Sequence, residues 1–349
     1  MTATLPRPTP AGSTRTPVGA RLGGLLRARE TGIALLIVVV FVAATVKNDA
    51  FASANSIQQL LLGASLIALL TVGQTMVIVT RNVDLSVGSV VGISAYVVGM
   101  TFRDHPGTPI LLGFVVGIAV GAFFGAVNGA VVTLFRVPSL VVTLAGLYVI
   151  RGLDGLLVDG VIINPQSIPR GFQRIGFETV LGVPVLFLLV LVVVLVAAYA
   201  MRSFRSARDL YAIGSNPDAA ELAGIPTQKR VFTAFLVSGS LAGLTGALFV
   251  ALFAQVDVTA GRGYEFLVVA AVVVGGVAIF GGSGTVIGAA LAAVLLNTID
   301  QALVSSRISG FWTDAIAGAL LLAAIAFDRS LSLRIARKLR TQEGAHRDV

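Results

Sequence analysis

Long apolar segments, rarely interrupted by charge, are the feature that most constrains the fold of this 349-residue chain. Hydrophobic residues make up 56% of it and charged residues 12%, whereas soluble domains average about 25% charged residues. A soluble fold would need many polar surface helices, and the sequence has almost none. Because about 20 mostly apolar residues span a bilayer as a helix, we predict an all-α polytopic membrane protein.

The apolar segments predict about ten transmembrane helices. The first of them is short for a span, and the sequence GGSG separates the eighth from the ninth. One broken re-entrant element over 266–303 is therefore the alternative to two complete spans there. The ten predicted spans are 31–46, 57–80, 84–102, 110–134, 137–157, 178–200, 230–254, 266–280, 285–303 and 311–327.

The basic residues indicate how the chain is oriented. Most of the 25 Lys and Arg side chains lie on the inner side if both termini are cytosolic, which is the usual bias of membrane proteins. Residues 1–30 are rich in Pro, Thr, Gly and Arg and lack the apolar region of a cleaved signal peptide. We expect a disordered cytosolic tail at 1–30, a membrane domain at 31–328 and a basic cytosolic tail at 329–349.

Several function classes find no support in the residue inventory. The formal charge of +8 lies in short flanks of apolar runs, which argues against nucleic-acid binding. Cysteine is absent, the two histidines are isolated, and none of the three lysines follows glycine. The chain therefore has no phosphate-binding P-loop, no expected metal site and no catalytic constellation. An ion-coupled secondary transporter would need buried acids, and its candidates, Asp154, Asp300 and Asp314, are expected at the periphery.

One polar stretch, ARDLYAIGSNPDAAELAGIPTQKR at 207–230, interrupts the apolar pattern. Asn216 suits an N-cap, Pro217 suits the first helical position, and Gly224 with Pro226 ends the helix. A helix of about two turns is marginal alone in water, so other groups must hold it. Its small side chains fit docking on a partner, and an ordinary ordered loop remains the alternative.

Four motifs carry a family resemblance: VDLSVGS (83–89), YAIGSNPDAAELAGI (211–225), TAGRGYEF (259–266) and GGSGTVIGA (281–289). Together they resemble the permease subunits of sugar ATP-binding-cassette (ABC) importers of the ribose, rhamnose and autoinducer-2 type, within the branched-chain permease superfamily. The similarity runs in order from about residue 33 to 328. The Arg81-Asn82 pair before the first motif departs from the ribose pattern and favours the rhamnose or autoinducer-2 side.

The resemblance implies an ABC importer permease fold in a bacterial cytoplasmic membrane. It implies three protein partners: a separate ABC ATPase that binds the ATP, so that this chain needs no cofactor; a second permease copy, identical or different; and an extracytoplasmic sugar-binding protein. The implied cargo is a monosaccharide of the rhamnose or ribose type, and autoinducer-2 or branched-chain amino acids are the alternative cargoes. The cytosolic loop 201–229 would couple to the ATPase through Ala212, Gly214, Asn216, Ala219, Ala220, Glu221, Leu222, Ala223, Gly224 and Ile225.

Further polar and small residues suggest roles inside the membrane. Asp84 or Ser86 could cap the helix that starts near them, or serve in a gate or translocation path with Asn128 and Asn297. Helix–helix hydrogen bonding is the alternative for the two asparagines. The outward segments 158–178, with room for a short lateral helix, and 255–265 would face the binding protein. A regular ladder predicts close helix packing at Gly113, Gly117, Gly121, Gly125 and Gly129.

Overall fold

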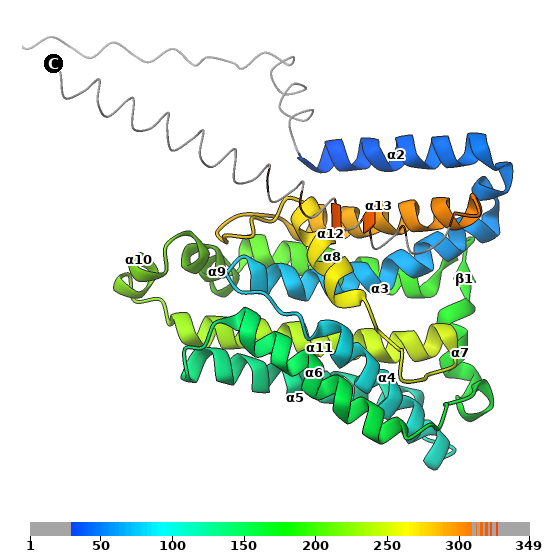
Figure 1. Ribbon diagram of the computed structural model, residues 1–349, viewed down its shortest axis with the longest axis horizontal. Helices are drawn as coiled ribbons and strands as arrows, with labels where there is room; N and C mark the ends of the chain where they lie inside the picture. Colours follow the sequence, from blue (N-terminus) through cyan, green and yellow to red (C-terminus); the bar gives the residue numbers. More distant parts are fainter. Residues whose placement is uncertain are drawn as a thin grey trace, which may run out of the picture.

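The computed structural model describes residues 29–308 and scattered positions between 312 and 326. Within this part of the chain the molecule is a bundle of helices with one small hairpin (Figure 1). The predicted all-α membrane fold is confirmed. The tails predicted at 1–30 and 329–349 lie almost wholly outside the described residues, as does most of the span predicted at 311–327.

Nine helices correspond to the first nine predicted spans. Seven are long and apolar enough to cross a membrane, and α4 and α12 are the other two. The nine are α2 (Arg29–Lys47), α3 (Ala54–Ile78), α4 (Val87–Asp104), α5 (Ile110–Leu134), α6 (Ser139–Val158), α8 (Val185–Ser203), α11 (Thr227–Phe253), α12 (Tyr264–Val274) and α13 (Val286–Ser305).

Helix α12 is too short to be the complete span predicted at 266–280. Its 11 residues rise about 16 Å, roughly half of a hydrocarbon core about 30 Å thick. The helix ends where Gly276 adopts positive φ, and Gly281, Gly282 and Gly284 also have positive φ in the loop that follows. The structure therefore matches neither expectation in full: α12 and the glycine-rich loop form a broken half-length element, but α13 is long enough to be a complete span rather than part of a re-entrant element.

The glycine ladder of α5 lies against α11. A Cβ atom added at Gly121 or Gly125 would meet backbone atoms of α11 around Gly239. Near the start of α5, Gly113 faces the rings of Phe102 and Phe172. The opposite side of α5 exposes large apolar side chains to the surroundings, as a lipid-facing surface does. The ladder thus brings two helix backbones into direct contact in the interior.

The short elements gather at the two ends of the bundle (Figure 1). At one end, here called the α10 end, lie α9 (Arg205–Ser215) and α10 (Pro217–Leu222). At the other, the α7 end, lie η1 (Asp49–Ala52), η2 (Pro165–Ser167), α7 (Arg170–Phe177), β1 (Thr179–Val180) and β2 (Val183–Pro184).

The hairpin corrects one predicted boundary. Thr179 pairs with Pro184 and Val180 with Val183. Leu181 and Gly182 both have positive φ at the turn, as a tight two-residue hairpin requires. The span predicted from residue 178 therefore begins at Val185. The short lateral helix expected within 158–178 is confirmed as α7.

Candidate functional site

Helix α10 is capped as its sequence predicts. The Asn216 side chain accepts a hydrogen bond from Ala219 N at 3.1 Å, and Pro217 occupies the first turn. At the other end Gly224 adopts φ of +77°, and Ile225 N donates to Ala220 O at 3.0 Å. This is the left-handed ending that glycine favours. Local signals alone therefore place both ends of this six-residue helix.

Long-range contacts hold α9, and through it α10, to the membrane helices. Arg81, which follows α3, donates from Nε to Gly214 O at 2.6 Å and from Nη2 to Ser215 O at 2.7 Å. Tyr211 donates to Gly284 O at 3.1 Å, and burial raises the pKa of the Tyr211 phenol, which keeps it protonated as a donor. Arg230 pairs with Asp209 at 2.8 Å. The end of α3, the start of α11 and the loop before α13 therefore all meet α9.

The ten residues of the expected coupling element divide into two groups. Ala212, Gly214, Ala220 and Ile225 face the protein, and a Cβ atom at Gly214 would collide with Val79 O. The other six are exposed, and Leu222 keeps 91% of its surface accessible. The exposed group is Asn216, Ala219, Glu221, Leu222, Ala223 and Gly224. One group anchors the element, and the other offers a small-residue surface with a single protruding leucine.

A buried polar network, here called the Asp84 network, lies at the segment between α3 and α4. Asp84 Oδ1 accepts from Ser86 N at 3.0 Å and from Ser86 Oγ at 2.6 Å. Asn128 Nδ2, on α5, donates to Ser86 Oγ at 2.8 Å. In the orientation that satisfies both of its ends, the Gln74 amide pairs with Asp84 N and Asp84 O, each at 3.2 Å. Three of the four residues considered for a gate or path therefore meet in one cluster.

The segment between α3 and α4 is not helical, and several of its backbone groups are hydrogen-bonded to side chains. Val83 N donates to Ser139 Oγ at 3.1 Å, and Thr143 Oγ1 donates to Val83 O at 3.1 Å. Irregular backbone at membrane depth persists only when protein groups replace water in this way. The prediction that Asp84 or Ser86 caps α4 is wrong. The helix begins at Val87 without a side-chain cap, because the Ser86 hydroxyl donates to the Asp84 carboxylate instead.

Asn297 lies apart from that cluster. Its Nδ2 donates to Leu60 O at 2.8 Å, across the contact of α13 with α3. A Cβ atom at Gly63 would lie 2.7 Å from Asn297 Oδ1. Gly63 precedes Gln74 by 11 residues, which is about 16 Å along a helix. Asn297 therefore joins two helices toward the α7 end and is not part of the Asp84 network.

A second buried charged cluster escaped the sequence analysis. Asp154 has none of its surface exposed, contrary to the expected peripheral position, and Arg151 Nη1 lies 4.0 Å from its carboxylate. Arg151 Nη1 also donates to Ala260 O at 2.7 Å. Gly92 and Gly88 make room, since Cβ atoms there would reach Asp154 and the Glu265 carboxylate. The four-residue spacing of these two glycines was the sequence signal that could have indicated close packing here.

Of the other two acids considered for an ion-coupled transporter, Asp300 is half-buried, and Asp314 lies outside the described residues.

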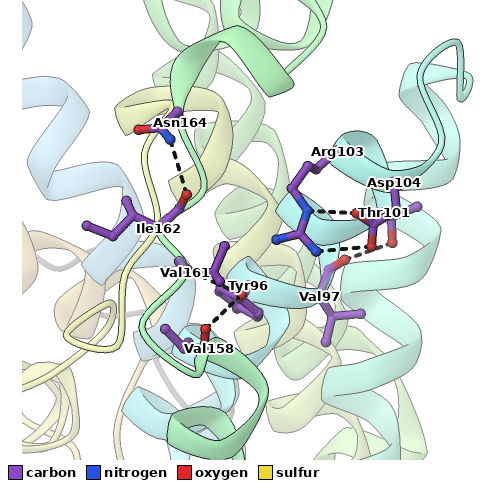
Figure 2. A network of polar contacts seen from close by, with 9 residues as sticks. All are labelled: Tyr96, Val97, Thr101, Arg103, Asp104, Val158, Val161, Ile162 and Asn164. Atoms are coloured by element: carbon purple, nitrogen blue, oxygen red, sulfur yellow. Dashed lines mark hydrogen bonds and ion pairs between the residues drawn. The ribbon is translucent and has the colours of Figure 1, made fainter.

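The α7 end is tied to α4 and α11 through the segment after α6. The buried Tyr96 hydroxyl donates to Val158 O at 3.3 Å or to Val161 O at 3.2 Å (Figure 2). Ile163 forms a β-bridge with Val256. The two segments expected to face a binding protein, 158–178 and 255–265, are therefore joined to each other and to the bundle.

Comparison with known proteins identifies the fold and the subunit type. A family model described as the permease component of a branched-chain amino acid transport system matches residues 56–325. The chain belongs to this permease family. The chain is therefore a polytopic transport subunit, and the family resemblance of the four motifs is confirmed. No solved structure matches the chain.

Relatives matched over nine-tenths of both chains share about a third of the aligned residues. The autoinducer 2 import system permease protein LsrC of Enterobacter sp. (strain 638) is 35% identical over 316 residues, which cover 90% of this permease and 91% of that protein. LsrC of Salmonella paratyphi B (strain ATCC BAA-1250 / SPB7) is 34% identical, with 91% and 90% covered. LsrC of Escherichia coli (strain K12 / DH10B) is 33% identical, with 91% and 92% covered.

Proposed function

We propose that this chain is the permease subunit of an ABC importer that carries a sugar-type molecule into the cell across the bacterial cytoplasmic membrane. Monosaccharides of the rhamnose and ribose type and autoinducer-2 are the candidate cargoes. The observation that carries the proposal is the 35% identity with an autoinducer 2 import permease over nine-tenths of both chains. A match of that length spans the bundle, the α9–α10 segment and the residues of the Asp84 network.

Energy for transport would come from a separate ATPase that docks on α10. Support comes from the exposed Leu222 and its small neighbours. It also comes from the bonds that join α9 to α3 through Arg81 and to the α12–α13 loop through Tyr211. Movement of α10 by an ATPase would thus reach the segment that holds the Asp84 network. The α10 end would then be cytosolic.

The α7 end would accordingly face outward and receive a substrate-binding protein. Its loops are fixed to the bundle by Tyr96 and by the Ile163–Val256 bridge. A second permease copy, identical or different, would complete the translocation path. Force from a docked binding protein would pass through these anchored loops into α4 and α11.

The test is uptake by the assembled importer. The permease would be reconstituted into proteoliposomes with its ATPase and binding protein, and uptake of rhamnose, ribose, autoinducer-2 and leucine would be compared with and without ATP. We expect ATP-dependent uptake of one of the first three compounds. Uptake of leucine alone would overturn the proposed substrate class, and uptake without ATP would overturn the proposed energy source.

A further inference from the structure

We propose that a hollow at the α7 end is a binding site for an uncharged, polyhydroxylated small molecule on its way through the permease. This inference rests on the proposed function, since it assigns a place in the chain to the sugar-type substrate. The hollow measures about 460 Å³ and lies between α3, α11, α13 and the α7–β1 segment. Its volume falls within the range common for small-molecule sites.

The side chains around the hollow are amides and aromatic rings. Asn55, Gln58 and Gln59 come from α3, and Gln301 comes from α13. No charged side chain is among the lining residues. An amide group both donates and accepts hydrogen bonds, as a sugar hydroxyl does. A leucine zwitterion would instead leave an ammonium and a carboxylate without charged partners, which is costly away from water.

Most of these amides are not used by the fold. Gln58 Nε2 donates to Gly182 O at 3.3 Å, which joins α3 to the hairpin turn. Within the described part of the chain, the side chains of Asn55, Gln59 and Gln301 form no intramolecular hydrogen bond. Their bonding capacity is therefore available to a ligand.

Two phenylalanines supply the apolar part of the site. Phe177, the last residue of α7, and Phe253, the last of α11, keep 63% and 50% of their surfaces exposed while lining the hollow. A sugar ring has one face of C–H groups, and that face gains by covering an aromatic ring. Amides on one helix pair and rings on another thus match the two kinds of surface that a monosaccharide presents.

The position of the hollow also suits a site on the transport path. Gly63 of its lining lies against Asn297, and α3 continues from there to Gln74 and the Asp84 network. The amide-lined hollow and the inner polar network therefore lie on one helix, about three turns apart.

Removal of single amides at nearly constant volume tests the site. Gln59→Met and Gln301→Met would be assayed in the reconstituted importer for uptake of rhamnose, ribose, autoinducer-2 and leucine. Thr45→Val is the matched control, because Thr45 lies near the same end on α2, donates to Phe41 O of its own helix at 2.9 Å and does not line the hollow. One hydrogen bond lost per variant predicts a fall in uptake of about two- to tenfold, with the control unchanged.

A second measurement separates substrate binding from assembly. Stimulation of the ATPase by the loaded binding protein should stay at the wild-type level in both variants. A parallel loss of that stimulation would assign the two glutamines to docking and overturn the site. Wild-type rates in both variants, with sugar uptake intact, would overturn the site and leave the proposed function standing. A wild-type importer that carries leucine alone, or none of the four compounds, would overturn both.

Discussion

At the residue scale, single atoms decide which positions of the bundle tolerate change. Gly121 lies so close to α11 that a Cβ atom would meet the backbone of Gly239 and Gly243. Gly152, on α6, has open space around its Cα. We expect Gly121→Val to destabilise the protein by about 1–3 kcal/mol through overpacking, and Gly152→Val to have little effect. Thermal unfolding of both purified variants in detergent checks this, and equal losses would contradict the assigned α5–α11 contact.

The Asp84 network allows a second residue-scale prediction. Ser86→Ala removes the acceptor of Asn128 Nδ2, so the two side chains should be coupled energetically. A double-mutant cycle of Ser86→Ala with Asn128→Ala should give a coupling free energy of about 0.5–3 kcal/mol. The same cycle with Asn297→Ala is the control, and it should be additive because Asn297 bonds to Leu60 instead. Unfolding free energies supply both values; additivity in the first cycle would remove Asn128 from the network.

At the scale of elements, local signals predicted α10 and long-range contacts determined the rest of the α10 end. Asn216, Pro217 and Gly224 act within their own turns, so the sequence alone located this helix. Helix α9 depends on Arg81, more than 130 positions away in the chain, and no local pattern reveals such a partner. The hollow at the α7 end went unnoticed for the same reason, because its amides come from helices far apart in the sequence.

Helix α10 carries an element-scale prediction. Gly224 has φ of +77° and open space around it, so Gly224→Val strains the backbone without a clash, whereas Gly224→Asn tolerates the left-handed conformation. Glu221→Lys reverses a charge on the exposed face. We expect Gly224→Val and Glu221→Lys to lower ATP-driven uptake while membrane insertion stays normal, and Gly224→Asn to keep most of the activity. Full uptake and ATPase binding in Val and Lys variants would contradict a coupling role.

At the scale of the whole molecule, hydropathy predicted the bundle because lipid requires long apolar helices, and it failed where protein replaces lipid. Helix α4 was predicted although it contains the buried Ser89, Ser94 and Tyr96, which its packed surroundings accept. The failure is at α12, which is apolar along its length but only 11 residues long. Apolar composition cannot distinguish a half-length helix inside the bundle from the start of a complete span.

The direction of the bundle in the membrane is the whole-molecule property that the basic residues predict. Because the chain has no cysteine, a single introduced thiol reports one position. Leu181, at the hairpin turn, is 100% exposed, and Leu222, on α10, is 91% exposed. A membrane-impermeant maleimide applied to intact cells should label Leu181→Cys and leave Leu222→Cys unlabelled until the membrane is permeabilised. The reverse pattern would place α10 outside, where no ATPase could reach it, and labelling of both thiols in intact cells would show that the two ends do not lie on opposite sides.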